Sequence, residues 1–388
     1  MNAEIIVSLE KLRNYVEKRD FAGYDLYDTL LSPLPFHWLG KWGPVLATQF
    51  QKRNPINIRP LLGIPQQRNP KGIGLFLHAY SLMAQVEKNS GYTEMAEKLF
   101  HWLLENRSTG YSGSCWGYNF PWAGPEKSIK AYTPSSVATG FVIRGIHEYY
   151  RLSGDQAARD IILDTTHFVL NDLPLTEDAT GICISYTPVL KDVCYNASLL
   201  GAEILARTYS LGGNEKYREM ACRAVDFVVA RQRGVGRWNY SLNPVTGTER
   251  KQVDFHQGYI LESLDIIAGL CGSMSNKLKE VIRKGLEFYE KDQVLPDGRT
   301  KWRWPEVWPV EIHNQSQGII TFSNLSSFGE DYDLLASKIA SWTIENMQDK
   351  KGFFYHQVHP HYKIKIPYMR WSQAWMTLAL ATLVKNNT

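Results

Sequence analysis

Ionisable side chains gather at the starts of several predicted helices, where they can take part in proton transfer. The stretch VDFHQGYILESL, residues 253–264, contains Asp254 and His256, and EIHNQ, residues 311–315, contains Glu311 and His313. Histidine and carboxylate side chains are common donors and acceptors of protons in enzymes. The pattern therefore predicts an acid–base site, and the candidate catalytic residues are Asp254, His256, Glu306, Glu311, His313 and Tyr195.

Each of these candidates also has a structural interpretation. Asp254 is a good N-cap for the helix that follows it. Glu306 can be a solvated loop charge, and a lone histidine such as His256 is more often hydrogen-bonded for structural reasons. Two carboxylates facing each other would permit glycoside cleavage, whereas His256, His313 and Tyr195 would permit proton abstraction. The sequence leaves both chemistries open.

Aromatic residues are concentrated in the loops that precede these helices. A sugar ring stacks its C–H faces on aromatic rings, and its hydroxyl groups need polar partners. The same aromatic residues can instead form a local loop core, because tryptophan and tyrosine pack well with one polar atom satisfied. The predicted substrate-binding residues are Tyr24, Asp25, Trp116, Tyr118, Trp122, Trp238, Trp302, Trp304, Tyr355 and Arg370.

Two kinds of helix alternate along the chain and would position these residues. One kind is amphipathic, with charged residues on one face, and is predicted over 93–106, 157–172, 217–232, 277–292 and 335–348. Each is followed by a loop of 15 to 23 residues and then by a helix with few charges. A helix that is apolar on all sides is typical of a buried position. The buried helix that contains Thr139 is predicted to begin with Thr133 as its N-cap and Pro134 as its first residue.

A period of about 60 residues relates the starts of the buried helices. The landmarks Thr139, Leu199, Tyr259, Gly318 and Trp375 stand 60, 60, 59 and 57 residues apart. Repeated pairs of a polar-faced and a buried helix predict an all-α fold, the (α/α)6 toroid or six-hairpin barrel, with short loop hairpins on one face. Because the first hairpin is weak in the sequence, a ring of five is the alternative.

The repeat runs nearly end to end, so we expect one toroid domain over residues 1–388. Within it, residues 1–70 form an N-terminal helix and an aromatic, proline-rich segment that packs on the toroid, and residues 71–388 form the repeated hairpins. All long loops and all inner-helix N-termini then lie at one end. These N-termini carry partial positive charge and free N–H groups, so we expect them to line one funnel.

Composition excludes several classes of protein. The net charge is +4 without a basic tail or stripe, which argues against a nucleic-acid partner. Five cysteines without a CxxC motif are typical of free thiols in a reducing compartment. We see no signal peptide and no apolar run long enough to span a membrane, so a cytoplasmic location is predicted. Neither a cofactor motif nor metal-ligand spacing is convincing, and we predict no cofactor and no metal.

Four motifs resemble a family of cytoplasmic proteins encoded among bacterial and archaeal capsule and exopolysaccharide biosynthesis genes. They are GYDLYDTL (23–30), CWGYNFPW (115–122), YTPSSVATGFV (132–142) and RWSQAWMTLAL (370–380). The six-hairpin pattern is also similar to that of unsaturated glucuronyl hydrolases, N-acylglucosamine 2-epimerases and several polysaccharide lyases. The resemblance implies a pathway, with other polysaccharide-biosynthesis proteins as partners, but no particular reaction.

A second resemblance concerns the turns. Gln348 and Gln232 each stand four residues before a glycine, as in the repeats of squalene cyclases and protein prenyltransferases. Those enzymes carry DxDD or DDxxD motifs, and the nearest approach here is EDYD, residues 330–333, which lies between helices. We therefore interpret the glutamine–glycine pattern as a turn that belongs to the fold.

The prediction from the sequence is a carbohydrate-active protein of surface-polysaccharide biosynthesis. Its substrate would be a sugar or oligosaccharide, and its chemistry acid–base work on a hexose or uronic-acid unit: epimerisation, lytic elimination or hydrolysis. The first alternative is a non-catalytic glycan-binding or assembly subunit of the same pathway. The second is a toroid that resembles a terpenoid cyclase.

Overall fold

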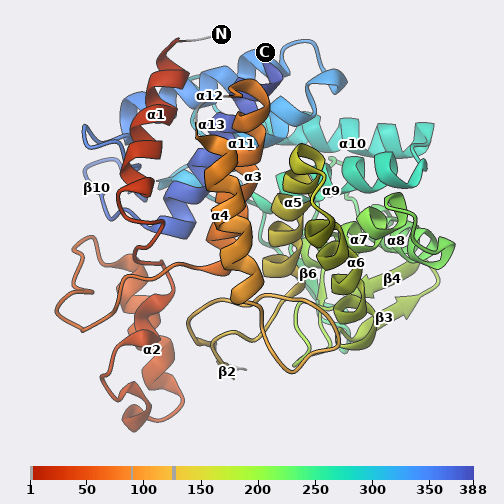
Figure 1. The fold of residues 1–388 in the computed structure, drawn as a ribbon, viewed down its shortest axis with the longest axis horizontal. Helices are drawn as coiled ribbons and strands as arrows, with labels where there is room; N and C mark the ends of the chain where they lie inside the picture. Colours follow the sequence, from red (N-terminus) through yellow and green to blue (C-terminus); the bar gives the residue numbers. More distant parts are fainter. Residues whose placement is uncertain (1–2, 89–90, 125–127) are drawn as a thin grey trace.

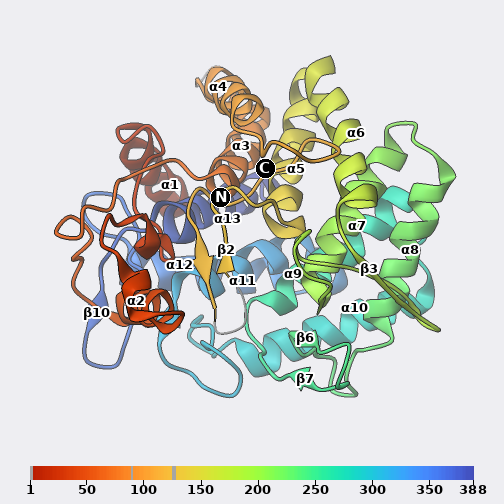
Figure 2. The same cartoon turned by 90° about the horizontal axis from the view of Figure 1, so that it is seen from below.

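The computed structural model describes residues 3–88, 91–124 and 128–388. Helices in two concentric rings dominate it (Figures 1 and 2). The inner ring consists of α3 (Pro70–Val86), α5 (Ser136–Ser153), α7 (Tyr195–Ser210), α9 (His256–Cys271), α11 (Ile312–Asn324) and α13 (Trp375–Asn386). The outer ring consists of α1 (Ala3–Glu17), α4 (Tyr92–Glu105), α6 (Gln156–Asn171), α8 (Glu215–Val229), α10 (Asn276–Phe288) and α12 (Tyr332–Met347).

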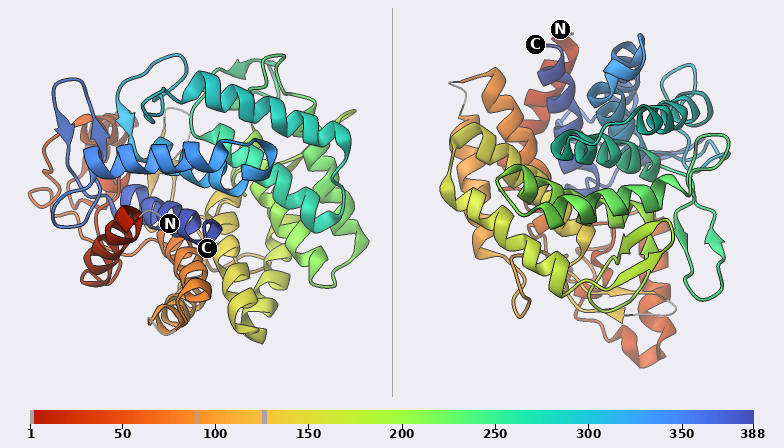
Figure 3. Two further views of the ribbon diagram at one scale, coloured as in Figure 1. Left: turned by 90° about the horizontal axis from the view of Figure 1, so that it is seen from above. Right: turned by 90° about the vertical axis from the view of Figure 1, so that its right-hand side faces the viewer.

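The ring closes between the first and last inner helices. Helix α13 packs on α3, and α1 packs on both α12 and α13 from outside, as the two views of Figure 3 also show. Helix α1 thus serves as the outer helix of the first hairpin. The described residues therefore contain six hairpins, which confirms the predicted toroid and decides against a ring of five.

Small sheets join the loops at the end of the toroid where the inner helices begin. Strands β5 and β6 pair with Val193 opposite Leu242, and β8 and β9 pair with Val310 opposite Val358. Because the strands of each pair come from successive loops, the sheets tie neighbouring hairpins together. The strands are β1 (Trp122–Ala123), β2 (Ser128–Ile129), β3 (Leu175–Asp178), β4 (Gly181–Ile184), β5 (Val193–Cys194), β6 (Ser241–Leu242), β7 (Glu249–Arg250), β8 (Val310–Glu311), β9 (Gln357–Val358) and β10 (Lys363–Ile364).

Shorter helical elements complete the fold. Helix α2 (Trp42–Arg53) belongs to the N-terminal segment and stands apart from the ring in Figure 1. A π-helix, η5, lies between the preceding loop and α13, so α13 does not begin directly after that loop. The short elements are η1 (Asp28–Leu31), η2 (Phe36–Leu39), η3 (Tyr289–Gln293), η4 (Ser326–Phe328) and η5 (Met369–Ala374). Among the described residues, no helix combines the length and apolar character that crossing a membrane requires.

One polar side chain near the start of each of five inner helices, in the first turns of α5, α7, α9 and α11 and in η5 before α13, explains the period of the sequence. Gln257 accepts a hydrogen bond from the Trp238 backbone N–H and donates one to its carbonyl, each at 2.9 Å. Gln373 makes the same pair of bonds with Phe354. Thr139, Ser198 and Gln315 also hold the loop that precedes their helix, through the backbones of Trp116, Ile184 and Thr300. These five residues are spaced 59, 59, 58 and 58 apart.

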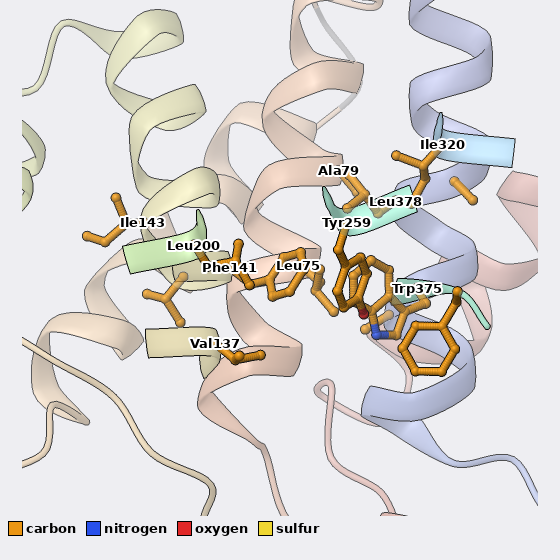
Figure 4. Packing of buried hydrophobic residues seen from close by; sticks show 14 of the residues in the cluster. Leu75, Ala79, Val137, Phe141, Ile143, Leu200, Tyr259, Ile320, Trp375 and Leu378 are labelled. Carbon is orange, nitrogen blue, oxygen red and sulfur yellow. The ribbon is translucent and has the colours of Figure 1, made fainter. Parts of the chain in front are cut away.

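Tight packing between α3 and α5 fixes the start of the ring. A Cβ atom added at Gly145 would lie 2.3 Å from the carbonyl oxygen of Gly74. One added at Gly74 would lie 2.7 Å from the Cα of Val142. Glycine is therefore required on both helices. Beside this contact, Phe141, Tyr259 and Trp375 meet at the ring centre with centroids 5.0 to 5.5 Å apart (Figure 4).

The helix positions agree with the sequence predictions, whereas two residues predicted as N-caps are not N-caps in the structure. Helix α5 begins at Ser136, and Ser135 is its N-cap, because its hydroxyl accepts a hydrogen bond from the N–H of Ala138. Thr133 and Pro134 lie before the helix. Asp254 stands one residue before the N-cap of α9, which is Phe255. The glutamine–glycine turns are confirmed, since the Nε2 atoms of Gln232 and Gln348 donate to the carbonyls of Gly236 and Gly352.

Candidate active site

The six inner helices begin at one end of the toroid, which we call the mouth. Figure 2 looks at the protein from below, toward this end, and the N-terminal segment with α2 lies to one side of it. Side chains from the first turns of α3, α9, α11 and α13 and from η5 meet there. We define the mouth cluster as Lys71, Asp254, Phe255, His256, Tyr259, Glu311, His313, Trp371 and Trp375.

Asp254 and His256 form a hydrogen-bonded pair at the start of α9. The Asp254 Oδ1 atom lies 2.5 Å from His256 Nδ1 and 3.2 Å from the His256 backbone N–H. Burial alone would raise the pKa of the Asp254 carboxyl, but the charge and hydrogen bond of His256 lower it below the usual value. Asp254 is therefore ionised and holds the imidazole by Nδ1. The other nitrogen of His256 is left for a substrate, and its side chain is 15% exposed.

His313 is a second imidazole in the same aromatic stack. Phe255 stacks on both rings, with centroids 4.1 Å from His256 and 4.0 Å from His313. The Tyr259 hydroxyl lies 2.5 Å from His313 Nε2, while no described residue is bonded to Nδ1. Burial and then the nearby Lys71 lower the pKa of His313 well below its usual value. The neutral imidazole is thus held beside a histidine that is paired with a carboxylate.

Lys71 brings a buried amine to the mouth from the first turn of α3. Its Nζ atom lies 4.4, 5.8 and 5.2 Å from the ring centroids of Phe141, Tyr259 and Trp375. No carboxylate among the described residues forms a salt bridge with it. Burial and then the charge of Arg370 lower its pKa well below the usual value. The site therefore weakens the hold of this amine on its proton, and the amine can donate a hydrogen bond in either form.

Glu311, the N-cap residue of α11, brings to the mouth cluster a carboxyl group whose pKa is shifted in the opposite direction to that of Asp254. Its Oε1 atom accepts a hydrogen bond from the indole N–H of Trp371, and His356 Nδ1 lies 3.9 Å away. Burial raises the pKa of Glu311 to about 7 even though the Trp371 bond lowers it, and the charge of Asp254 adds to the rise. Glu311 and Asp254 thus differ in protonation near neutral pH, which suits one as an acid and the other as a base.

The N-terminal segment is fastened to the mouth by buried ion pairs. Both Asp25 oxygens accept hydrogen bonds from Arg370 at 2.6 Å, and within the segment Asp28 accepts one from Arg59 at 2.7 Å. The Tyr27 ring packs on Trp371. The predicted binding residues Asp25 and Arg370 therefore lie at the mouth and are engaged with each other. Tyr24, two residues before Leu26, packs with a small apolar group beside this pair.

Below the mouth, a second set of ionisable residues fills the axis of the toroid. Arg144 on α5 donates to both oxygens of Glu203 at 2.5 and 2.9 Å and lies 3.3 Å from Glu262. Arg207 contacts Glu203 at 3.3 Å and His147 at 2.9 Å. We call these residues, with Ser263, Gln317 and Thr321, the axial network.

The predicted loop aromatics separate into two groups. Trp116 and Trp238 are fully buried, and their indole N–H groups donate to the Leu103 and Val228 carbonyls. These two residues belong to the core, so they offer no ring face to a sugar. Tryptophan in a loop can anchor that loop instead of binding a ligand. The other predicted aromatics keep partial exposure or lie nearer the surface.

These outer aromatics are held in different surroundings. Tyr118 stacks on Phe120 at 5.4 Å beneath Arg370. The Trp304 indole donates to Asp292 at 3.1 Å, and Arg303 lies over the Trp302 ring. Trp122 is half-buried in β1, and the hydroxyl of Tyr355 donates to Asp349. Of this group, Tyr118 has the Arg370 contact that links it to the mouth.

Two predicted catalytic residues lie away from the mouth cluster. The Tyr195 hydroxyl donates to Glu249 on β7 at 2.9 Å, and this bond and burial raise its pKa. Glu306 is exposed in the loop before α11, where its backbone bridges to Arg303. The structure therefore gathers Asp254, His256, Glu311 and His313 and leaves the other two outside. Lys71, Phe255, Tyr259, Trp371 and Trp375 complete the cluster and were not among the predicted site residues.

Metal binding finds no support in the part of the chain that the structure describes, since no three His, Cys, Asp or Glu residues lie close enough to hold an ion. His359 and His361 line a surface groove of about 380 Å³ with Trp308 and Tyr362, outside the mouth cluster. The acidic stretch 330–333 is at the start of α12 on the outer ring.

Comparison with known proteins identifies the fold. No family model and no curated protein matches the sequence. A cellobiose 2-epimerase from Bacillus thermoamylovorans B4167 has a similar structure, with a TM-score of 0.66, 15% identity and 98% of this chain and 99% of that chain covered. An unsaturated glucuronyl hydrolase specific for heparin gives a TM-score of 0.63 at 10% identity over 99% of this chain and 95% of that one. A GH76 α-mannanase of Bacteroides thetaiotaomicron gives 0.62 at 13% identity over 83% and 88%. The likeness establishes the (α/α)6 toroid.

Proposed function

We propose that the protein is a sugar epimerase or isomerase whose mouth cluster moves a proton at the carbon beside a carbonyl. The observation that carries this proposal is the Asp254–His256 pair, at 2.5 Å, in one stack with the neutral imidazole of His313. An ionised carboxylate on Nδ1 orients an imidazole and fixes which ring nitrogen faces the substrate. Two imidazoles on one aromatic stack permit removal of a proton and its return from a second position.

The roles follow from the surroundings of each group. The unbonded nitrogen of His256 takes the proton from a ring-opened sugar, and Asp254 stabilises the imidazolium that forms. Lys71 and the Tyr259 hydroxyl supply hydrogen bonds where negative charge develops on the carbonyl oxygen. In isomerisation the His256 imidazolium returns its proton to the neighbouring carbon and is neutral again. In epimerisation His313 first takes a proton from solvent and gives it to the opposite face of the same carbon, and His256 then releases its proton to solvent. Structural neighbours support this assignment, since they include two sugar epimerases and a D-mannose isomerase.

A second candidate function is glycan cleavage. The observation in its favour is the contrast between Glu311, whose pKa is raised to about 7, and Asp254, whose pKa is lowered. A protonated and an ionised carboxyl are the groups that a hydrolase needs. Asp254 is already bonded to His256 and Gln252, which favours orientation of histidine over direct attack.

A role in surface-polysaccharide biosynthesis is part of the proposal and rests on the motifs in residues 23–30, 115–122, 132–142 and 370–380. A glycan-binding subunit without catalysis remains the alternative from another class. It would use the same mouth without transferring a proton.

The test is incubation of the protein in deuterated water with reducing hexoses, disaccharides and unsaturated uronides, followed by NMR and mass spectrometry. Deuterium at a ring carbon together with a new epimer or ketose is the expected result. A new reducing end or a new double bond would instead support hydrolysis or elimination. Binding in calorimetry without any product would support the glycan-binding alternative and overturn the epimerase proposal.

A further inference from the structure

Helix α2 and the short helix η2 before it carry five large apolar side chains that are exposed. Trp38, Leu39, Leu46 and Phe50 are 80%, 76%, 63% and 63% exposed, and Trp42 is 50% exposed. Residues 42, 46 and 50 are four apart and so lie on one helical face, with 38 and 39 extending it backward. We call these five residues the α2 stripe. A contiguous exposed apolar surface of this kind is rare on a soluble protein and marks an interaction site.

The opposite face of α2 fastens the helix to the protein. Val45, Thr48 and Gln51 are buried on that face. Lys52 donates to the Tyr27 hydroxyl at 3.1 Å, and Tyr27 packs on Trp371 of the mouth cluster. The stripe is therefore held outward by a helix that already has its own buried face. It does not need further contacts within the chain to fold.

The segment of the chain that carries the stripe has charges of one sign. No aspartate or glutamate occurs between Asp28 and Glu87, whereas this segment contains six lysines and arginines. Lys41 and Arg53 flank the stripe and are exposed. Cationic residues beside a face of tryptophan, leucine and phenylalanine are typical of a helix that lies in the interface of an anionic membrane. Tryptophan is enriched at the level of the lipid headgroups.

A second copy of the chain is a weaker match for the stripe. Two stripes packed face to face would bring Lys41 and Arg53 of both copies together with no nearby carboxylate of the segment to offset them. An anionic bilayer supplies both the apolar layer and the opposite charge. We propose that α2 is a peripheral membrane anchor that inserts its stripe into the headgroup region of anionic lipid.

The anchor stands at the mouth end of the toroid. In Figure 1 and in the right-hand view of Figure 3, α2 projects beyond the ring at the end where the inner helices begin, while both termini lie at the other end. A protein bound through α2 would therefore turn its mouth end toward the membrane. This inference does not depend on which reaction the mouth performs.

The experiment is co-sedimentation with vesicles of phosphatidylcholine alone and of phosphatidylcholine with phosphatidylglycerol. The full-length protein is expected to bind the anionic vesicles at least about tenfold better and to lose this preference in high salt. Trp42→Ser/Phe50→Ser and Lys41→Glu/Arg53→Glu are each expected to weaken binding about tenfold or more. The matched control is Val245→Ser/Leu334→Ser, which changes residues that are 90% and 70% exposed elsewhere and is expected to bind like wild type.

Three results would overturn the anchor. One is no binding of folded wild-type protein to the anionic vesicles, with the fold verified by circular dichroism. Another is equal loss in the α2 variant and in the Val245→Ser/Leu334→Ser control. The third is a wild-type dimer in sedimentation velocity that the α2 substitutions dissociate while vesicle binding is absent, which would assign the stripe to a second copy.

Discussion

The inner helices bury two sets of ionisable residues that differ in how their charges are matched. In the axial network, Arg144 meets Glu203 and Glu262, and Glu262 also receives hydrogen bonds from Gln317 and Thr321. In the mouth cluster, Lys71 has aromatic rings around its amine, and His313 Nδ1 has no partner among the described residues. The charges of the axial network are thus matched, although Arg207 Nε and Gln317 Oε1 have no partner among the described residues, whereas the amine of the mouth cluster has no carboxylate partner.

This difference indicates which buried charges hold the fold and which serve a reaction. A buried pair whose charges match is costly to break but contributes little to chemistry. A buried group that is left without its usual partner lowers stability, and such groups gather at functional sites because their pKa values are shifted there. We therefore assign the axial network to the structure of the ring and the mouth cluster to the function.

The largest effect is expected from breaking the axial network. Arg144→Met leaves Glu203 without its two strongest hydrogen bonds, and should lower the free energy of unfolding by about 3–5 kcal/mol. The exposed Arg283 pairs with the exposed Glu280 in a surface salt bridge, and Arg283→Met should cost less than about 1 kcal/mol. Urea unfolding followed by circular dichroism measures both. Equal costs for the two variants would remove the structural role of the axial network.

A pH effect should follow from the mouth carboxyl. Because the pKa of Glu311 is raised to about 7 from its ordinary 4.5, the folded protein holds a proton that the unfolded chain has lost between those values. The free energy of unfolding should therefore fall as pH rises from 5 to 7.5, by about 2–3 kcal/mol for this group, and stay level above it. Glu311→Gln should reduce the slope. A wild-type slope that the variant keeps unchanged would contradict the protonated carboxyl.

Removing the mouth amine should separate stability from function. Lys71→Met deletes a buried amine that lacks a carboxylate partner, so the free energy of unfolding should stay the same or rise by up to about 2 kcal/mol. Proton exchange into the sugar should nevertheless fall, because the carbonyl oxygen loses a hydrogen-bond donor. Thermal unfolding and NMR on one sample test the two halves. A destabilised but active variant would reverse the assignment.

The smallest effect is expected at Glu306. Its side chain is exposed in the loop before α11, and surface substitutions away from special contacts change stability by less than about 0.5 kcal/mol. Glu306→Gln should therefore keep both melting temperature and turnover, the latter within about twofold. A large loss of turnover would place the mouth chemistry partly in that loop.

Local patterns predicted the helices of the ring, because the polar and apolar faces are written directly in the sequence. The predicted outer helix 93–106 is observed as Tyr92–Glu105, and 157–172 as Gln156–Asn171. The period of about 60 residues also has a local cause, because the repeating polar residues form hydrogen bonds with the backbone of the loop that precedes them. The predicted cap Thr133 was wrong because the serine pair that follows, Ser135 and Ser136, can cap equally well.

The candidate site was predicted only in part, since it depends on contacts between helices. Asp254 and His256 were found because they are neighbours in sequence. Lys71 was missed because no acidic residue stands near it in the sequence to suggest an acid–base pair. It lies at the mouth only because α13 closes on α3. Trp116 and Trp238 were selected for their loops, and their burial depends on the outer helices whose carbonyls accept their N–H groups.

The central claim, that the mouth cluster catalyses proton transfer while the axial network holds the ring, can be tested on His256→Gln. The variant keeps a polar group near Asp254 and removes the base. We predict a melting temperature within a few degrees of wild type and loss of deuterium transfer from solvent into the sugar by at least about a hundredfold. Undiminished exchange in this variant, or no exchange in wild type with any sugar tested, would contradict the account.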